Sequence, residues 1–184
     1  GDKEEATCYV WTAAHVVAGL RKTRSVIDQR TGTSKTVVEF DDASIVQELS
    51  EGGRRVGEVK MDAQIIRYSN ADTGEDLALL QIRKKNFVSK DVSVKFYLDK
   101  DVPPIGTELY HVGSLLGQMG ANSLTSGLIS QQGRVLSNGK VFGQSSAVAF
   151  PGSSGGLLSI KDDGRIVGVL VRGAGEGFNL FVGT

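Results

Sequence analysis

Two serines stand among three glycines in Phe150-Pro151-Gly152-Ser153-Ser154-Gly155-Gly156-Leu157-Leu158, directly before an apolar segment that is typical of a core strand. A serine in such a turn has little structural purpose unless its hydroxyl and the neighbouring N–H groups are used. Gly152 allows a sharp turn with its amide pointing outward, and Gly155 and Gly156 let a substrate approach the backbone without interference from a Cβ atom. The stretch therefore predicts a nucleophilic serine beside backbone donors that suit an oxyanion.

A nucleophilic serine needs a base and an acid that orients the base. Two other segments provide them. His15 ends a predicted strand in Thr12-Ala13-Ala14-His15-Val16-Val17, and Asp76 opens a predicted buried strand in Asp76-Leu77-Ala78-Leu79-Leu80. The other histidine, His111, lies within a predicted strand and is interpreted as a barrel residue. We therefore expect the catalytic residues to be His15, Asp76 and Ser154, in that order along the chain.

Each of these assignments has a rival. Ser153 competes with Ser154, but only Ser154 has a glycine two positions before it and another directly after it. Asp72 and Glu75 lie close enough to compete with Asp76, which is preferred because it abuts the apolar strand that would bury it. Asp76 would otherwise serve as a cap for the next segment, and His15 as an ordinary residue at a strand end.

The serine stretch also fits Gly-x-Ser-x-Gly, the nucleophile elbow of α/β-hydrolases. That family requires its histidine after the serine. None of the residues that follow Ser154 is a histidine. The order of the residues therefore excludes this class of hydrolase.

The composition argues against several other classes of protein. The 184 residues include 21 basic and 21 acidic side chains, so net charge is zero and no electrostatic footprint for nucleic acid or an anionic membrane is present. Cys8 is the only cysteine and there are two histidines, which excludes a disulfide framework and argues against a structural zinc site, so we expect no metal and no cofactor. No apolar run approaches the roughly 18 residues of a transmembrane span. The charged start, residues 1–5, is not a signal peptide, and the compartment stays open.

Glycine is frequent, with 24 residues, proline is rare, with three, and short β-branched runs recur between turn signals. This pattern predicts an all-β sandwich or barrel. One helical turn is expected at 13–20, and the charged segment 83–104, which ends in Pro103-Pro104, is expected to connect two halves. Asp162-Asp163-Gly164 predicts a hairpin. The predicted strands of the first half are 7–12, 36–40, 44–49, 56–66 and 77–82. The strands 36–40, 44–49 and 56–66 are expected to form a meander. The predicted strands of the second half are 108–112, 123–130, 139–143, 156–160, 165–171 and 178–182.

The order His, Asp, Ser, with Thr-Ala-Ala-His at a strand end and a Gly-x-Ser-Gly-Gly turn, resembles the chymotrypsin-like (trypsin-like) serine proteases. Within that superfamily the chain is most similar to the protease domain of the HtrA/Deg-like branch. The resemblance covers roughly Thr7 to Val182. The segments that carry the closer similarity are Val112-Gly113-Ser114, Leu124-Thr125-Ser126-Gly127-Leu128-Ile129-Ser130 and Pro151-Gly152-Ser153-Ser154-Gly155-Gly156.

This resemblance implies two perpendicular six-stranded antiparallel β-barrels with the active site in the cleft between them. Residues 1–95 would carry His15 and Asp76, and residues 96–184 would carry Ser154. Ser154 Oγ would attack a peptide carbonyl, His15 would transfer the proton, and Asp76 would orient the imidazole. The oxyanion hole would be formed by Gly152, Ser153 and Ser154, with the N–H groups of Gly152 and Ser154 as donors.

The resemblance also implies a specificity pocket lined by Val148, Ala149, Val171, Arg172, Gly173 and Phe178. With Val148 at its base the pocket lacks an acidic residue there, so a small or medium apolar residue is expected before the cleaved bond. Arg172 does not fit that simple description. Ser153 stands where digestive-type members have an aspartate, so activation by a newly cleaved N-terminus is not expected.

The expected partner is a protein or peptide substrate, and an oligomer is left open. Two alternatives to a constitutively active protease are considered. One is a catalytically silent binding module that keeps the fold. The other is a latent protease whose oxyanion loop, around residues 151–153, is ordered only by a peptide, a partner or an oligomer.

Overall fold

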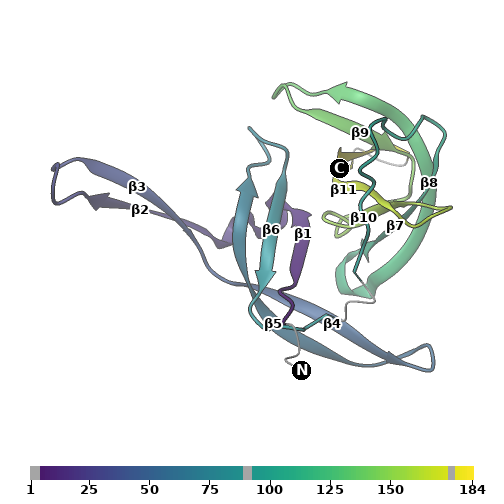
Figure 1. Cartoon of the computed structure of the whole chain (residues 1–184), viewed down its shortest axis with the longest axis horizontal. Helices are drawn as coiled ribbons and strands as arrows, with labels where there is room; N and C mark the ends of the chain where they lie inside the picture. The colour runs from purple at the N-terminus through teal and green to yellow at the C-terminus, as the bar shows by residue number, and fades with distance from the viewer. Residues whose placement is uncertain (1–4, 89–92, 174–176) are drawn as a thin grey trace.

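Strands dominate the part of the chain that the computed structural model describes, residues 5–88, 93–173 and 177–184 (Figure 1). The first half contains β1 (Tyr9–Ala13), β2 (Arg21–Ile27), β3 (Ser34–Phe40), β4 (Ala43–Glu51), β5 (Arg54–Ser69) and β6 (Leu77–Ile82). The second half contains β7 (Glu108–Leu115), β8 (Gly120–Val135), β9 (Val141–Ser145), β10 (Leu157–Ile160), β11 (Ile166–Gly173) and β12 (Asn179–Gly183). The all-β class predicted from the sequence is confirmed.

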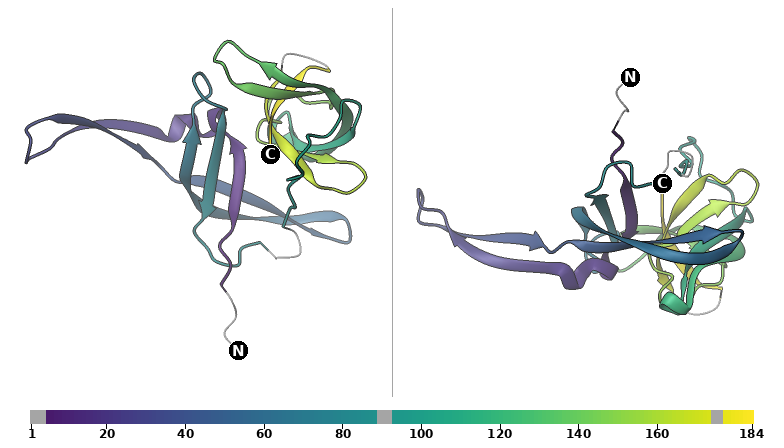
Figure 2. Two further views of the ribbon diagram at one scale, coloured as in Figure 1. Left: turned by 45° about the horizontal axis from the view of Figure 1, so that its top comes forward. Right: turned by 90° about the horizontal axis from the view of Figure 1, so that it is seen from below.

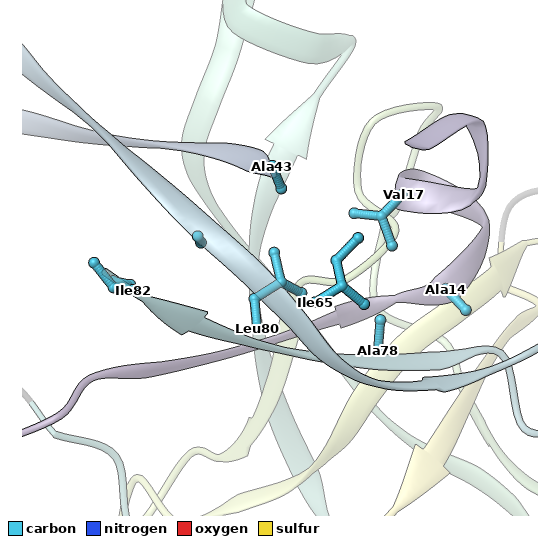
Figure 3. Close-up of a cluster of buried hydrophobic side chains, with 8 residues drawn as sticks. Ala14, Val17, Ala43, Ile65, Ala78, Leu80 and Ile82 are labelled. Atoms are coloured by element: carbon cyan, nitrogen blue, oxygen red, sulfur yellow. The ribbon is translucent and has the colours of Figure 1, made fainter. Parts of the chain in front are cut away.

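The core of the first half lies against an antiparallel four-stranded sheet in the order β1-β6-β5-β4. Strand β6 coincides with the predicted strand 77–82. Its even-numbered residues are buried because side chains alternate between the two faces of a strand. Figure 3 shows these residues gathered with side chains from the neighbouring elements. The buried cluster consists of Ala14, Val17, Ala43, Ala63, Ile65, Ala78, Leu80 and Ile82.

Strands β2 and β3 form a separate hairpin that projects away from the rest of the molecule (Figures 1 and 2). Strand β2 was not predicted, and β3 pairs with β2 rather than continuing the meander into β4. Nearly all residues of β2 are exposed, so this hairpin contributes little to the core. The closed six-stranded barrel expected for the first half is therefore wrong for the described residues, because only four of the six strands share a sheet and its edges at β1 and β4 stay unjoined.

The second half is a closed barrel with the strand order β10-β11-β12-β9-β8-β7, as expected from the sequence. The predicted hairpin at residues 162–164 is confirmed by the antiparallel pairing of β10 with β11. The core side chains of this barrel include Leu109, Ile129, Leu158 and Phe181. Closure fixes every strand of this half against two neighbours.

Within residues 5–88, 93–173 and 177–184, helical structure is confined to short turns. The helix α1 (Ala14–Val17) and the 3-10 turn η1 (Ala18–Leu20) follow β1 directly, as predicted for 13–20, and η3 (Gly117–Met119) lies between β7 and β8. No helix among the described residues is long and apolar enough to cross a membrane. The arrangement places His15 at the junction between β1 and α1.

The two halves pack against each other beside this junction. Ala13 and Leu77 from the first sheet contact a cluster of the closed barrel that includes Phe142, Val171 and Leu180. The ends of β1 and β6, where His15 and Asp76 lie, are thereby brought to the face of β11.

Candidate active site

His15 and Asp76 form a hydrogen-bonded pair. The imidazole Nδ1 lies 2.8 Å from Asp76 Oδ2, and the backbone N–H of His15 donates to Asp76 Oδ1 at 2.9 Å. Both carboxylate oxygens are therefore used to hold one residue. Because Nδ1 is occupied by the carboxylate, Nε2 is the nitrogen left to exchange a proton with another group.

Asp76 is held in an unusual position. Its side chain is 1 % exposed, whereas that of His15 is 42 % exposed. Its backbone has a φ of +62°, in the left-handed region that few residues other than glycine adopt. The Ala14 N–H donates to the Asp76 carbonyl at 2.9 Å and fixes this conformation. Strained backbone that is held by its surroundings is common at functional sites.

The two rival serines have different environments. Ser153 is 1 % exposed, and its Oγ accepts the Phe150 N–H at 3.2 Å, so this hydroxyl is turned into the protein. Ser154 instead lines a cavity of about 670 Å³ that His15 also lines. The structure thus brings Ser154 and His15 to one cavity, with Asp76 buried behind His15, and directs Ser153 away from it.

The turn that carries Ser154 is fixed by backbone hydrogen bonds. Ser153 N–H donates to the Phe150 carbonyl at 2.9 Å, and Gly155 N–H donates to the Leu170 carbonyl at 2.7 Å. The Pro151 carbonyl accepts the Leu116 N–H at 2.9 Å. Because a trans peptide points its N–H opposite to its C=O, the Gly152 N–H is directed away from residue 116.

Gly152 cannot be replaced without strain. Its φ is +99°, and a Cβ atom at this position would lie 2.4 Å from the Ser114 carbonyl oxygen. The glycine is required for the turn and for the close approach of the loop that contains residues 114–117.

The cavity brings together most, but not all, of the residues expected in a specificity pocket. Ala149, Val171, Arg172 and Gly173 line it, whereas Val148 and Phe178 are not among its lining residues. Four further lining residues were not expected in the specificity pocket: Phe150, Pro151, Leu170 and Asn179. Alternation along a strand gave no signal for Asn179, because the consecutive residues 170–173 of β11 all line this cavity and only the register between strands shows which residue of β12 joins them.

The loop that delivers Asp76, residues 70–76, is here called the aspartate loop. It is held partly by the first half, since Ser69 Oγ donates to Glu75 Oε2 at 2.5 Å and Gly74 N–H donates to the Asn70 carbonyl at 2.7 Å. The remaining contacts come from the closed barrel.

Three side chains of the closed barrel reach the aspartate loop. Asn138 Nδ2 donates to the Gly74 carbonyl at 3.1 Å, and Lys140 Nζ lies 2.7 Å from Glu75 Oε1. Arg172 donates from Nη2 to the Ala71 carbonyl, and its Nε lies 3.9 Å from Asp76 Oδ2. The hydrogen bond from Lys140, followed by that from Ser69, lowers the pKa of Glu75 to about 2. The aspartate loop is therefore fastened to both halves of the molecule.

His111 lies in β7 behind the serine turn, and its side chain is fully buried. A Cβ atom at Gly156 would lie 2.5 Å from His111 Nε2, which shows how closely the ring packs on this turn. Burial lowers the pKa of the His111 imidazole, an effect partly opposed by the Ser153 backbone. His111 is therefore a neutral packing residue at neutral pH, consistent with its interpretation as a barrel residue.

The described residues contain no group of three or more histidine, cysteine, aspartate or glutamate side chains that could hold a metal ion. Cys8 is partly buried, and its Sγ contacts the backbone of Val88. The chemistry available to the site comes from a hydroxyl, an imidazole, a carboxylate and backbone N–H groups.

Comparisons with known proteins place the chain in a family. The model of the family "Trypsin-like peptidase domain" matches residues 2–169. The chain is 33% identical over 121 residues to "Serine protease Do-like HtrA" of Lactococcus lactis subsp. lactis, and equally similar to that of subsp. cremoris. These matches cover 61% of this chain and 28% of each relative, so the chain spans less than a third of their length.

Solved structures show the same fold. The structure described as "HtrA-type protease AlgW with decapeptide" has a TM-score of 0.63 at 22% identity, over 96% of this chain and 45% of the other. The crystal structure of Deg5 has a TM-score of 0.54 at 24% identity, over 93% of this chain and 71% of the other.

Proposed function

Since this chain belongs to the family of trypsin-like peptidase domains, we propose that it is a serine endopeptidase that uses His15, Asp76 and Ser154. The observation that carries the proposal is the shared cavity, lined by Ser154 and by a histidine whose Nδ1 is bonded to a buried carboxylate. The sequence relatives named as serine proteases support the same reaction.

The reaction follows from the residue types. Ser154 Oγ attacks the carbonyl carbon of the scissile peptide bond while His15 Nε2 takes its proton. The imidazolium then protonates the leaving amine, and an acyl-enzyme remains on Ser154. Water, deprotonated by His15, hydrolyses that ester. Asp76 keeps the proton of the neutral imidazole on Nδ1 and stabilises the cation that forms.

The oxyanion is proposed to bind to the turn Gly152, Ser153 and Ser154, with the N–H groups of Gly152 and Ser154 as donors. The hydrogen bond from Leu116 to the Pro151 carbonyl supports this, because it fixes the orientation of the peptide that contains the Gly152 N–H. A loop held in this way favours a site that is formed without a partner over a latent one.

Internal cleavage is favoured because two hollows meet at the nucleophile. Ser154 lines the cavity of about 670 Å³ together with Arg172 and Gly173, and it also lines a second one of about 410 Å³ together with Val16 and Val112. A polypeptide substrate needs room before and after the cleaved bond. The largely apolar lining of the first cavity supports the proposal of a small or medium apolar side chain before that bond.

We also propose that the chain divides functionally near residues 95 and 96, with the base and acid in the first part and the nucleophile in the second. The separate buried clusters of the two halves support this division.

The test is covalent labelling with a fluorophosphonate, together with cleavage of casein. Both are expected in the unmodified protein and should disappear in Ser154→Ala. Ser153→Ala removes the rival hydroxyl, which accepts the Phe150 N–H inside the same turn, so this variant should be labelled more slowly but still at Ser154. A folded protein that is neither labelled nor active would support the silent binding module instead. Specific activity that rises with protein concentration or with added apolar peptides would support latency.

A further inference from the structure

Asn179 is a buried polar residue in the wall of the cavity that holds Ser154. It lies in β12, opposite Gly173 of β11 on one side and Ser145 of β9 on the other. Its residue exposure is 1 %. Asn179 and Gly173 both line the cavity. Asn179 is therefore placed among the residues that would contact a bound substrate.

The two polar atoms of the Asn179 amide have unequal environments. Nδ2 donates to the Ala147 carbonyl at 2.7 Å. Oδ1 is buried, and none of the described residues donates a hydrogen bond to it. Most buried polar side-chain atoms in proteins have a partner, so an acceptor without one calls for an explanation.

The orientation of the amide is determined by its neighbour. The Ala147 carbonyl is an acceptor, and the Ala147 N–H is already donated to Ser145 Oγ at 3.0 Å. The Asn179 amide nitrogen must face this carbonyl, so the oxygen points to the other side. On that side it lies next to Gly173, where an added Cβ atom would come within 2.6 Å of Oδ1. The unpaired acceptor thus adjoins a glycine of the cavity wall.

We propose that Asn179 determines specificity by accepting a hydrogen bond, at Oδ1, from the side chain of the substrate residue that precedes the cleaved bond. The substrate class is therefore polypeptide with threonine or serine at that position. This inference rests on the proposed function of the same cavity and adds a polar requirement to its apolar lining.

The rest of the cavity favours a hydroxyl over other donors. Leu170 and Val171 supply apolar surface, which suits the methyl group of threonine. Among the described lining residues Arg172 is the permanently charged one, and it disfavours lysine or arginine in the substrate. A hydroxyl provides the missing donor without a charge and within a small volume.

The test compares matched peptides that differ only in the residue before the cleaved bond, threonine or valine. These two side chains have nearly the same shape, so the comparison isolates the hydroxyl. We expect kcat/KM to be about 10-fold higher for threonine, the usual size of one hydrogen bond to a neutral partner. A third peptide with O-methylthreonine keeps the oxygen without its hydrogen, and it should lose the advantage.

The variant Asn179→Leu removes the acceptor and should bring the ratio of threonine to valine to one or below. If this variant fails to fold, the O-methylthreonine peptide decides the question in the unmodified protein. Equal or faster cleavage of the valine peptide by the unmodified protein would overturn the inference, as would a preference for asparagine or glutamine over threonine. Cleavage of neither peptide, with no fluorophosphonate labelling of Ser154, would instead be a failure of the proposed function.

Discussion

The serine turn and the aspartate loop are built in different ways. The turn that carries Ser154 is held by backbone hydrogen bonds to its own barrel, from Leu116, Ser153 and Gly155. The aspartate loop belongs to an open sheet, and side chains of the other half, including Lys140 and Arg172, reach across to hold it. The hydrogen bonds that fix the serine turn therefore come from one half alone, although Gly155 packs closely on Thr12 of β1, whereas the hydrogen bonds that fix the aspartate loop come from both halves.

This difference indicates where the site is most sensitive. Backbone hydrogen bonds inside a closed barrel give a turn little freedom to move. Side-chain contacts between two halves are individually weaker, and several of them are partly exposed to solvent. Substitutions in the serine turn should remove catalysis locally, whereas substitutions around the aspartate loop should reduce it in steps as contacts are lost.

The largest effect in this comparison is expected for Asp76→Asn. The amide keeps the size of the side chain, but its nitrogen cannot accept the Nδ1 proton, so His15 is pushed toward the wrong tautomer. We expect kcat to fall by about 10⁴-fold. Steady-state kinetics on a peptide substrate measure this, and unchanged circular dichroism checks the fold. A loss smaller than about tenfold would show that another carboxylate, such as Asp72 or Glu75, supplies the acid.

Gly152→Ala tests whether the backbone of the serine turn holds the oxyanion donor in place. The new Cβ atom would lie 2.4 Å from the Ser114 carbonyl oxygen, at a φ of +99° that alanine rarely adopts. The peptide before it should rotate and withdraw one oxyanion donor, with a loss on the order of 10²–10³ in kcat. The matched control is Gly164→Ala, also at positive φ but with open space around it. If both variants lost activity equally, the effect would be one of folding and not of the oxyanion site.

The sequence predicted best those segments whose residue pattern fits few local structures. The glycines around Ser154 and the apolar run after Asp76 fixed the positions of the serine turn and of β6, because each pattern has few structural uses. The hairpin β2–β3 was only half predicted. Most residues of β2 are exposed, so its sequence lacks the alternation by which strands at a core are recognised.

Contacts between the halves could not be predicted from the sequence. Lys140 and Asn138 are ordinary turn residues by composition, and only the fold brings them to Glu75 and Gly74. The place of Asn179 in the cavity could not be predicted either, and its neighbour Phe178 was expected there instead on the basis of the resemblance. A pattern of period two shows that adjacent residues face opposite ways, but the register between strands decides which one meets the cavity.

Arg172→Met should have an intermediate effect because it removes the link between β11 and the aspartate loop. Methionine keeps much of the apolar stem and loses both the hydrogen bond to the Ala71 carbonyl and the charge near Asp76. We expect kcat to fall about tenfold, with a smaller change in KM. Arg172→Lys keeps the charge without the planar donor fork and should recover only part of the rate. A change confined to KM would assign Arg172 to substrate binding alone.

The smallest effect is expected for the ion pair of Lys140 with Glu75, whose side chains are 39% and 40% exposed. Loss of either charge should reduce kcat about two- to fivefold, since exposed pairs contribute little. The double variant Glu75→Lys, Lys140→Glu keeps the ion pair with its charges exchanged, and it should recover part of the lost kcat. Additive losses in the double variant would mean that the two side chains act independently of each other.

The same pair makes a prediction about pH. The pKa of Glu75 is lowered to about 2 in the folded protein, chiefly by the hydrogen bond from Lys140, from an ordinary value of 4.5. A carboxyl with a lowered pKa stabilises the folded state at pH values above its unfolded pKa, and this stabilisation is lost as the pH falls toward the folded pKa. The melting temperature of the unmodified protein should therefore exceed that of Glu75→Gln at pH 7 by a constant margin down to about pH 4.5. Between there and about pH 2 the two curves should converge, whereas parallel curves over that range would show that Glu75 is not held by Lys140 in solution.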